Sequence, residues 1–108
     1  MTRVKSAILV SAALRYADKE LIDCVLVHRG DADAGAIFVH IDARDGRHQI
    51  LARSLDLDGM YNWQVITTDE WVDADAAKTR LERELARDPD AFVIEVNDPA
   101  ARNPFLTL

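Results

Sequence analysis

The dipeptide Asp45-Gly46 constrains the fold of this chain more than any other feature, because it lies between two short apolar runs. A type I′ turn needs positive φ at both central positions, and Asp-Gly adopts it readily. The flanking runs, residues 36–42 and 48–53, are therefore predicted to pair as an antiparallel hairpin. With a two-residue turn, Ile41 lies opposite Ile50. An antiparallel sheet is thus expected at the centre of the fold.

Two helical patterns and three further strand patterns surround this hairpin. Apolar residues at helical spacing, among them Ile8, Ala12 and Tyr16, predict a helix over residues 5–19. A second helix is predicted to begin among residues 68–73 and to end at Arg87, before Pro89. Strands are predicted at residues 23–29, 61–67 and 91–96. The order α-β-β-β-β-α-β predicts a single α+β domain over residues 1–108, with two helices and a mainly antiparallel sheet of about five strands.

The predicted registers divide this sheet into two faces. If the first two strands pair directly, the core face, which both helices would cover, holds Cys24, Leu26, Ile37, Val39, Ile41 and Ile50. The opposite face carries Val25, Val27, Phe38 and Leu51 beside His40, Gln49 and Arg53. That face is more apolar than a water-exposed face normally is. We expect it to be covered by the C-terminal segment 104–106, by a second copy of the chain or by a partner protein, with internal cover and a homodimer left equally open.

Val25, Val27, Phe38 and Leu51 are therefore candidate interface residues, and Trp71 joins them because it lies among acidic residues where core packing is not the obvious alternative. Trp63 alternates with Tyr61 and Val65 and is expected to pack in the core.

Charge is distributed unevenly along the chain. Residues 31–75 carry three basic and ten acidic groups, a net charge of −7, whereas the whole chain has a net charge of −6. An acidic surface repels phosphate, so neither nucleic acid nor an anionic membrane is an expected partner. A basic protein is the partner that such a surface would suit.

Cys24 is the only cysteine, so an internal disulfide and a thiolate zinc cluster within one chain are excluded. It lies in an apolar run and is expected to be a small buried hydrophobe. The run at residues 7–14 resembles a short secretory signal, but Ser11 interrupts it and Arg15 follows it at once. A packed helix and a cytoplasmic location are therefore the preferred interpretation.

The segment from Gly30 to Gly35 is the candidate ligand loop. Its carboxylates Asp31 and Asp33, beside His28 and Arg29, could hold a divalent cation or position a water molecule, with Arg29 binding an anionic group. The spacing fails the EF-hand pattern, because glycine is missing at the required sixth position. A turn whose aspartates cap their own backbone amides is the simpler interpretation.

No other motif points to chemistry. On the predicted register His28 and His48 share the core side and His40 lies on the other face, without metal-ligand spacing. Neither a phosphate-binding glycine loop nor a nucleophile elbow is present. We therefore expect no catalytic residue, no cofactor and no metal.

Three segments together resemble a known family. They are residues 10–15 (VSAALR), residues 27–39 (VHRGDADAGAIFV) with the glycine-aspartate loop, and residues 82–96, which run through Asp88-Pro89-Asp90. In this order they are similar to the alphaproteobacterial family called domain of unknown function 1491. The resemblance implies a bacterial cytoplasmic domain and brings no activity or catalytic residue with it.

The sequence thus predicts a non-catalytic binding or assembly module that acts as a homo-oligomer through the second sheet face and the acidic loop. The alternative is a small metal-binding protein or enzyme that uses the Gly30 to Gly35 loop.

Overall fold

The structure is a computed structural model and describes residues 4–106. It confirms the α+β class and the predicted order of elements. Along the chain these are α1 (Ser6–Lys19), β1 (Asp23–His28), β2 (Ile37–Asp42), β3 (His48–Leu55), β4 (Tyr61–Val65), α2 (Ala74–Arg87) and β5 (Phe92–Asn97). Helix α2 begins at the predicted acidic segment, where the side chain of Asp73 accepts a hydrogen bond from the Ala76 amide.

The five strands form one sheet in the order β1-β5-β2-β3-β4. Strands β2 and β5 are parallel, and the other three pairings are antiparallel. The expected direct pairing of the first two strands is wrong, because β5 lies between them. The segment between His28 and Ile37 is long enough to pass β5 and to span two strand spacings, about 10 Å.

The central hairpin is one residue out of the predicted register. Val39 pairs with Leu51 and Ile41 pairs with Gln49, so Ile41 does not face Ile50. The reason is a wider turn: Arg44 and Gly46 both have positive φ, at 67° and 88°, and the Ala43 amide donates to the Arg47 carbonyl at 3.0 Å. The loop therefore has three central residues, and every β3 side chain moves to the face opposite the predicted one.

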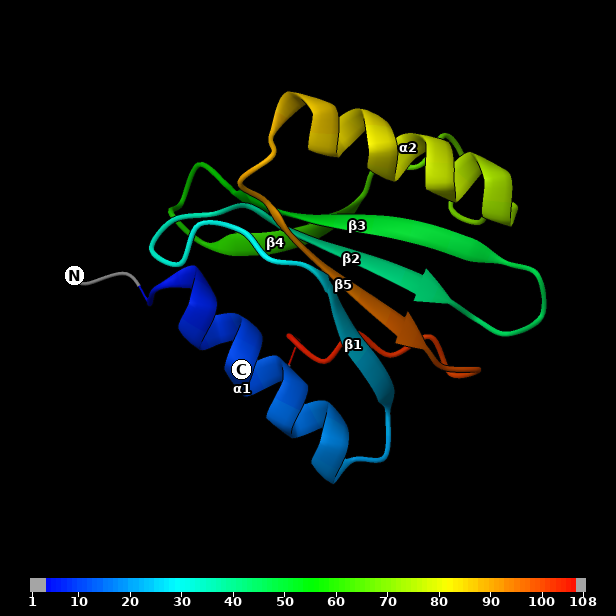
Figure 1. Ribbon diagram of the computed structural model, residues 1–108, viewed down its shortest axis with the longest axis horizontal. Coiled ribbons are helices and arrows are strands. Elements are labelled where there is room, and N and C mark those ends of the chain that lie inside the picture. Colours follow the sequence, from blue (N-terminus) through cyan, green and yellow to red (C-terminus); the bar gives the residue numbers. More distant parts are fainter. Residues whose placement is uncertain (1–3, 107–108) are drawn as a thin grey trace.

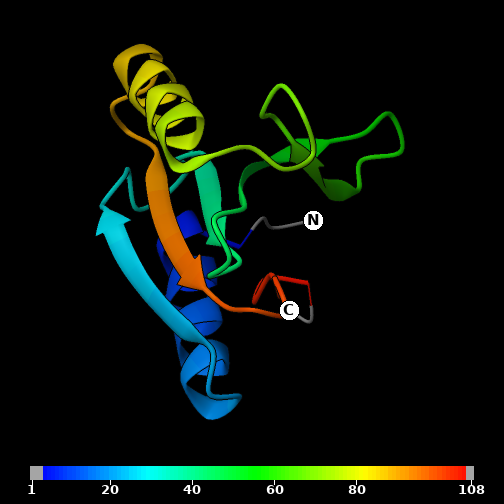
Figure 2. The ribbon, with the colours of Figure 1, turned by 90° about the vertical axis from the view of Figure 1, so that its right-hand side faces the viewer.

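The two helices cover opposite faces of the sheet, which corrects the expectation that both cover one face. Figure 1 shows α2 above the sheet and α1 below it, and Figure 2 shows the same layers from the side. The core under α1 contains Val39, Ile41, Leu51, Ile94 and Phe105, and the core under α2 contains Phe38, Ile50, Ala77, Ala91 and Val93. Ile50 and Leu51 have therefore exchanged their predicted sides. Phe105 of the C-terminal segment packs on the α1 side against Trp63, not on the second face.

The loop from Gly30 to Gly35 makes closer backbone contacts than a larger residue would permit. A Cβ atom built on Gly30 would lie 2.3 Å from the Asp90 carbonyl oxygen, and one on Gly35 would lie 2.6 Å from the same atom. The Asp31 amide donates to that carbonyl at 2.8 Å, and the Phe92 amide donates to Ala36 at 2.7 Å. Both glycines are therefore needed for the loop to lie against the start of β5.

The same loop completes the N-terminus of α1. The N-cap residue Lys5 offers no side-chain acceptor, and the carbonyls of Asp33 and Ala32 instead accept from the amides of Ser6 and Ala7. The buried Ser6 hydroxyl donates to the Gly35 carbonyl at 2.7 Å. Loop carbonyls thus satisfy helix amides that would otherwise lack a partner.

Replacing Gly30 with alanine is expected to destabilise the protein by about 1–3 kcal/mol, because the new methyl group meets backbone atoms that cannot rotate away. Urea unfolding measures the free energy of unfolding. Gly59→Ala is the control, because Gly59 has open space around it and only its positive φ opposes a side chain. A Gly30→Ala variant as stable as Gly59→Ala would contradict the close-contact interpretation.

Candidate functional site

The predicted ligand loop makes contacts within the fold. The carboxylate of Asp31 accepts from the Ala34 amide at 3.0 Å, as the capping interpretation expects, and Asp33 lies 3.5 Å from the Lys5 ammonium. His28 donates from Nδ1 to the Ala91 carbonyl at 2.7 Å, and Arg29 is exposed. Across residues 4–106, no three His, Cys, Asp or Glu side chains are grouped as a metal site would require.

The five candidate interface residues do not form one surface. Val25 and Val27 on β1 are 47% and 59% exposed. Phe38 is buried under α2, and Leu51 is buried on the α1 side. Trp71 is half-buried, with the Arg47 guanidinium 4.7 Å from its ring centre.

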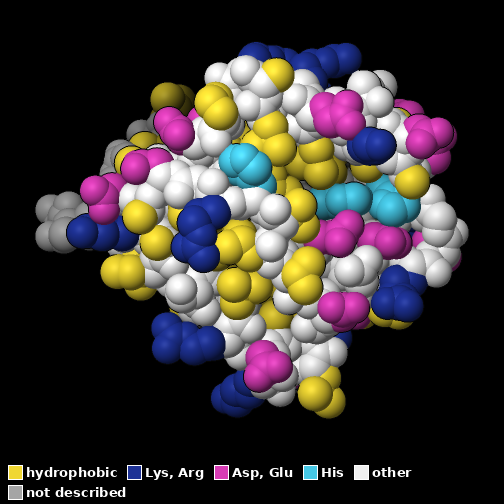
Figure 3. Space-filling view, viewed as in Figure 1, with side chains coloured by type: hydrophobic (Ala, Val, Ile, Leu, Met, Phe, Trp, Pro, Cys, Tyr) yellow, Lys and Arg dark blue, Asp and Glu magenta, His cyan; other side chains and the backbone are white. Residues whose placement is uncertain are grey.

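A groove of about 440 Å³ lies where α2 crosses the second face of the sheet. Its apolar lining comes from β1, β5 and α2, and its polar lining includes two histidines. Figure 3 shows hydrophobic side chains gathered in this hollow, with histidine and acidic side chains side by side at its right-hand edge. The residues that line the groove are Val27, His40, His48, Ala74, Lys78, Leu81, Glu82, Leu85, Val93 and Glu95.

A chain of three polar side chains runs along one side of the groove. His40 and Glu95 are neighbours in the parallel β2·β5 register, and Nδ1 of His40 lies 3.6 Å from a carboxylate oxygen of Glu95. Nε2 of His40 and Nδ1 of His48 are hydrogen-bonded at 3.0 Å. The carboxylate favours a proton on Nδ1 of His40, so Nε2 accepts from His48, and Nε2 of a neutral His48 keeps its lone pair.

The pKa of His40 reflects its burial and its contacts with Glu95 and His48. Burial lowers the pKa of His40 below 6.5, while Glu95 opposes the shift and His48 adds to it. As pH falls, His40 therefore takes up a proton at a higher pH in the unfolded chain than in the folded protein. The stability that neutral His40 contributes is complete above about pH 6.5 and is lost as pH falls toward the folded pKa.

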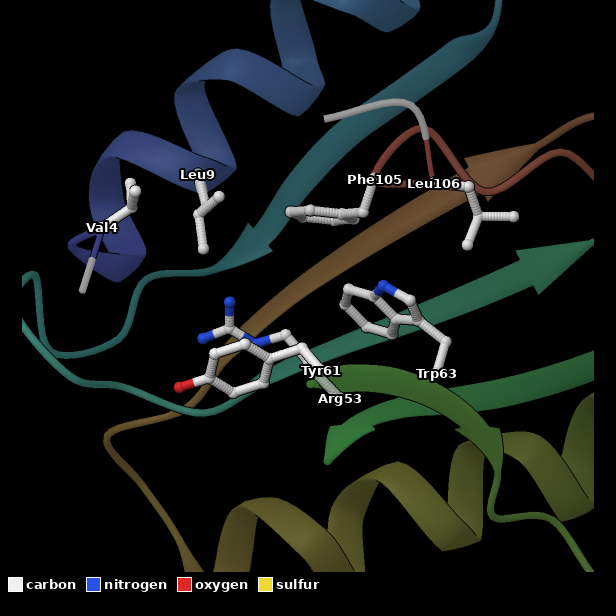
Figure 4. Close-up of a pocket in the computed structure, with 7 residues that line it drawn as sticks. All are labelled: Val4, Leu9, Arg53, Tyr61, Trp63, Phe105 and Leu106. Atoms are coloured by element: carbon white, nitrogen blue, oxygen red, sulfur yellow. The ribbon is translucent and has the colours of Figure 1, made fainter. Parts of the chain in front are cut away.

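A second cavity, of about 290 Å³, lies on the α1 side of the sheet (Figure 4). Trp63 and Phe105 line it and contact each other with ring centres 4.9 Å apart, and the Arg53 guanidinium lies 4.2 Å from the Tyr61 ring centre. Trp63 and Phe105 contact each other and belong to the α1-side core. We therefore take the groove under α2 as the candidate site.

Sequence reasoning missed this site for one identifiable reason. The predicted hairpin register placed His48 on the face opposite His40, and the wider turn brings the two together. Glu95 becomes their neighbour only through the parallel pairing of β2 with β5. An acidic residue within the apolar strand Phe92–Asn97 was the one signal available.

A five-stranded sheet with one helix on each face defines this chain as a small α+β protein with two separate cores. The chain belongs to the family described as protein of unknown function (DUF1491), whose family model matches residues 4–106. No curated protein matches it. Of the helices in the described residues, none has the length and hydrophobicity that a bilayer crossing demands.

Solved structures of this family share the fold. The crystal structure of a DUF1491 family protein from Caulobacter crescentus CB15 has a TM-score of 0.85 and 28% identity, over 97% of this chain and 96% of that one. The NMR structure of a DUF1491 family protein from the same organism has a TM-score of 0.83 and 28% identity, over 99% and 96% of the two chains. The solution structure of protein Atu0922 from A. tumefaciens has a TM-score of 0.78 and 26% identity, over 99% and 95%.

Replacing Glu95 with glutamine is expected to lower the titration midpoint of His40 further, because the carboxylate is the main group that opposes its downward shift. Proton NMR of the imidazole ring measures the midpoint in each variant. Glu82→Gln serves as the control, since Glu82 lines the same groove but does not contribute to the pKa shift of His40. An unchanged or higher midpoint in Glu95→Gln would refute the proposed electrostatic contact.

Proposed function

We propose that this protein is a non-catalytic binding module that takes a small, mainly apolar ligand with one polar head group into the groove under α2. The observation that supports this proposal most is the placement of the His40–His48 pair beside the apolar wall that Leu81, Leu85 and Val93 form. Small-molecule sites commonly combine apolar walls with a few convergent polar groups, in volumes of about 300–1,000 Å³.

The apolar walls determine the shape of the ligand. Leu81 and Leu85 approach from α2, while Val27 and Val93 approach from the sheet. Val27 is 59% exposed although it faces the hollow, so a bound molecule would remove apolar surface from water. Burial of that surface would supply most of the binding free energy.

The polar chain determines the head group. With His40 neutral, His48 can accept a hydrogen bond from a hydroxyl or a protonated carboxyl group. With a proton taken up, the same pair donates to an anion, and Glu95 compensates the added charge. The exposed Lys78 ammonium, at the same groove, adds attraction for a carboxylate.

Binding without chemistry is the better match to the groove lining. The two histidines offer a base, but none of the residues that line the groove is a serine, threonine or cysteine that could act as a nucleophile beside it. The alternative of metal binding or catalysis at the Gly30 to Gly35 loop gains no support from the contacts there, since both carboxylates already serve the fold.

The free thiol of Cys24 bears on where the protein is located. Burial, with the carboxylate of Asp23 beside it, raises the pKa of the Cys24 thiol to about 11. The thiol therefore stays protonated near neutral pH and is a weak nucleophile. We propose the cytoplasm as the location because Cys24 is the single cysteine of the chain and is a free thiol, whereas proteins of oxidising compartments commonly carry disulfides.

Hexanoate and hexanol are suitable probes, because they share an apolar chain and differ in head group. Methyl NMR is expected to show saturable shifts at Leu81, Leu85 and Val93, with hexanoate binding more tightly as pH falls and His40 takes up a proton. Leu85→Asn is expected to weaken binding about tenfold or more, because it removes buried apolar contact.

Leu21→Asn is the matched control for this experiment. Leu21 is exposed, does not line the groove and is expected to leave both affinities unchanged. If neither probe shifts the groove methyls, or if Leu85→Asn binds as tightly as the unchanged protein, the proposed function is wrong.

A further inference from the structure

The two edges of the sheet differ in how they are protected. Strand β1, at one edge, begins with Asp23 and contains a bulge between Leu26 and His28. Strand β4, at the other edge, pairs with β3 without a register shift and reads Tyr-Asn-Trp-Gln-Val, with no charge and no proline. Natural edge strands usually carry bulges, charges or proline, because an unprotected edge recruits other strands. Strand β4 lacks these features.

The register of β4 shows which of its backbone groups face outward. The Ile66 amide donates to the Ile50 carbonyl at 2.9 Å, and the Asp56 amide donates to the Met60 carbonyl at 2.8 Å. Antiparallel pairing alternates, so the even-numbered residues of β4 bond toward β3. The amide and carbonyl groups of Trp63 and Val65 therefore point away from β3, toward the outer edge.

Exposed apolar side chains gather on the same hairpin. Leu57 is 106% exposed and Met60 is 64% exposed in the loop, and Leu55, Tyr61 and Val65 beside it are also exposed. Figure 2 shows this hairpin, in green, projecting from the body of the molecule. Several exposed apolar residues on one projecting hairpin indicate an interaction surface.

We propose that β4 pairs antiparallel with β4 of a second copy of this chain, about a two-fold axis at Trp63. This is the register that uses the outward groups of the strand symmetrically, because Trp63 then exchanges both backbone hydrogen bonds with the partner's Trp63. The pairing extends the sheet of one copy directly into the sheet of the other.

A second copy suits this edge because the strand is complementary to itself. About that axis Tyr61 lies opposite the partner's Val65, an aromatic and β-branched pair that stabilises sheets. Asn62, whose side-chain amide donates to Asp56 at 2.9 Å, lies opposite the partner's Gln64, so two uncharged amides face each other across the strands. The exposed Met60 lies opposite the partner's Ile66 on the other face. No like charges face each other anywhere along the strand.

The proposal is independent of the ligand groove, because no residue of β4 lines that groove. It differs from the homodimer expected from the sequence, which used the second sheet face. It can therefore be tested on the unliganded full chain.

Sedimentation velocity on the full chain provides the test. The unchanged protein is expected to sediment as a dimer. The double variant Asn62→Lys/Gln64→Lys places lysine opposite lysine at both ends of the paired strands and is expected to weaken the dimer at least tenfold. The double variant Asn62→Lys/Gln64→Glu places lysine opposite glutamate and is expected to remain dimeric. Both altered residues are exposed, so both variants should fold, which circular dichroism checks.

Val25→Lys is the control at the opposite edge and is expected to leave the dimer intact. A protein that stays monomeric at millimolar concentration would overturn the proposal. So would a Lys/Lys variant that dimerises as well as the Lys/Glu variant, or a Val25→Lys variant that dissociates.

Discussion

The close backbone contact between the Gly30 to Gly35 loop and the start of β5 is the constraint on which the rest of the structure depends. Gly30 and Gly35 both lie against the Asp90 carbonyl, at distances that exclude a side chain. This contact guides the chain across β5, so that β1 and β2 flank that strand on opposite sides. The same loop supplies the carbonyls that complete α1. One segment thus determines strand order and holds a helix, which explains its distinctive sequence without any ligand.

Covering the sheet on both faces has a consequence for the inner strand β5. In β5 the side chains of Phe92, Val93, Ile94 and Val96 are buried, as expected for a strand with a helix on each side. Glu95 is half-buried, as is Asn97 at the end of the strand, and Glu95 lines the groove beside His40. A charged residue in such a strand conflicts with local hydrophobic patterning. Conflicts of this kind are expected at functional sites, where stability has been given up for a chemical role.

Local patterns were sufficient to predict the elements of this fold but not their pairing. Helix α2 begins and ends where the acidic segment and Pro89 indicated, since capping and dipole effects act within a few residues. The hairpin register depended on whether Asp45-Gly46 or the wider Arg44 to Gly46 turn formed, and both suit the same residues. A shift of one position reversed every β3 side chain and brought His48 next to His40. The position of β5 depends on contacts distant in sequence, which no local pattern records.

The two proposed surfaces lie at positions that allow both to operate at once. The sheet residues that line the groove come from β1, β5, β2 and β3, which are the strands away from the β4 edge. Pairing through β4 therefore joins two molecules at one end of each sheet and leaves both grooves open to ligand. Strand β4 pairs with residues 51–55 of β3, whereas His48 lies at the other end of that strand and pairs with Asp42 of β2. The β4 edge and the ligand groove are therefore separate surfaces, and ligand binding at His40 and His48 does not depend on dimer formation.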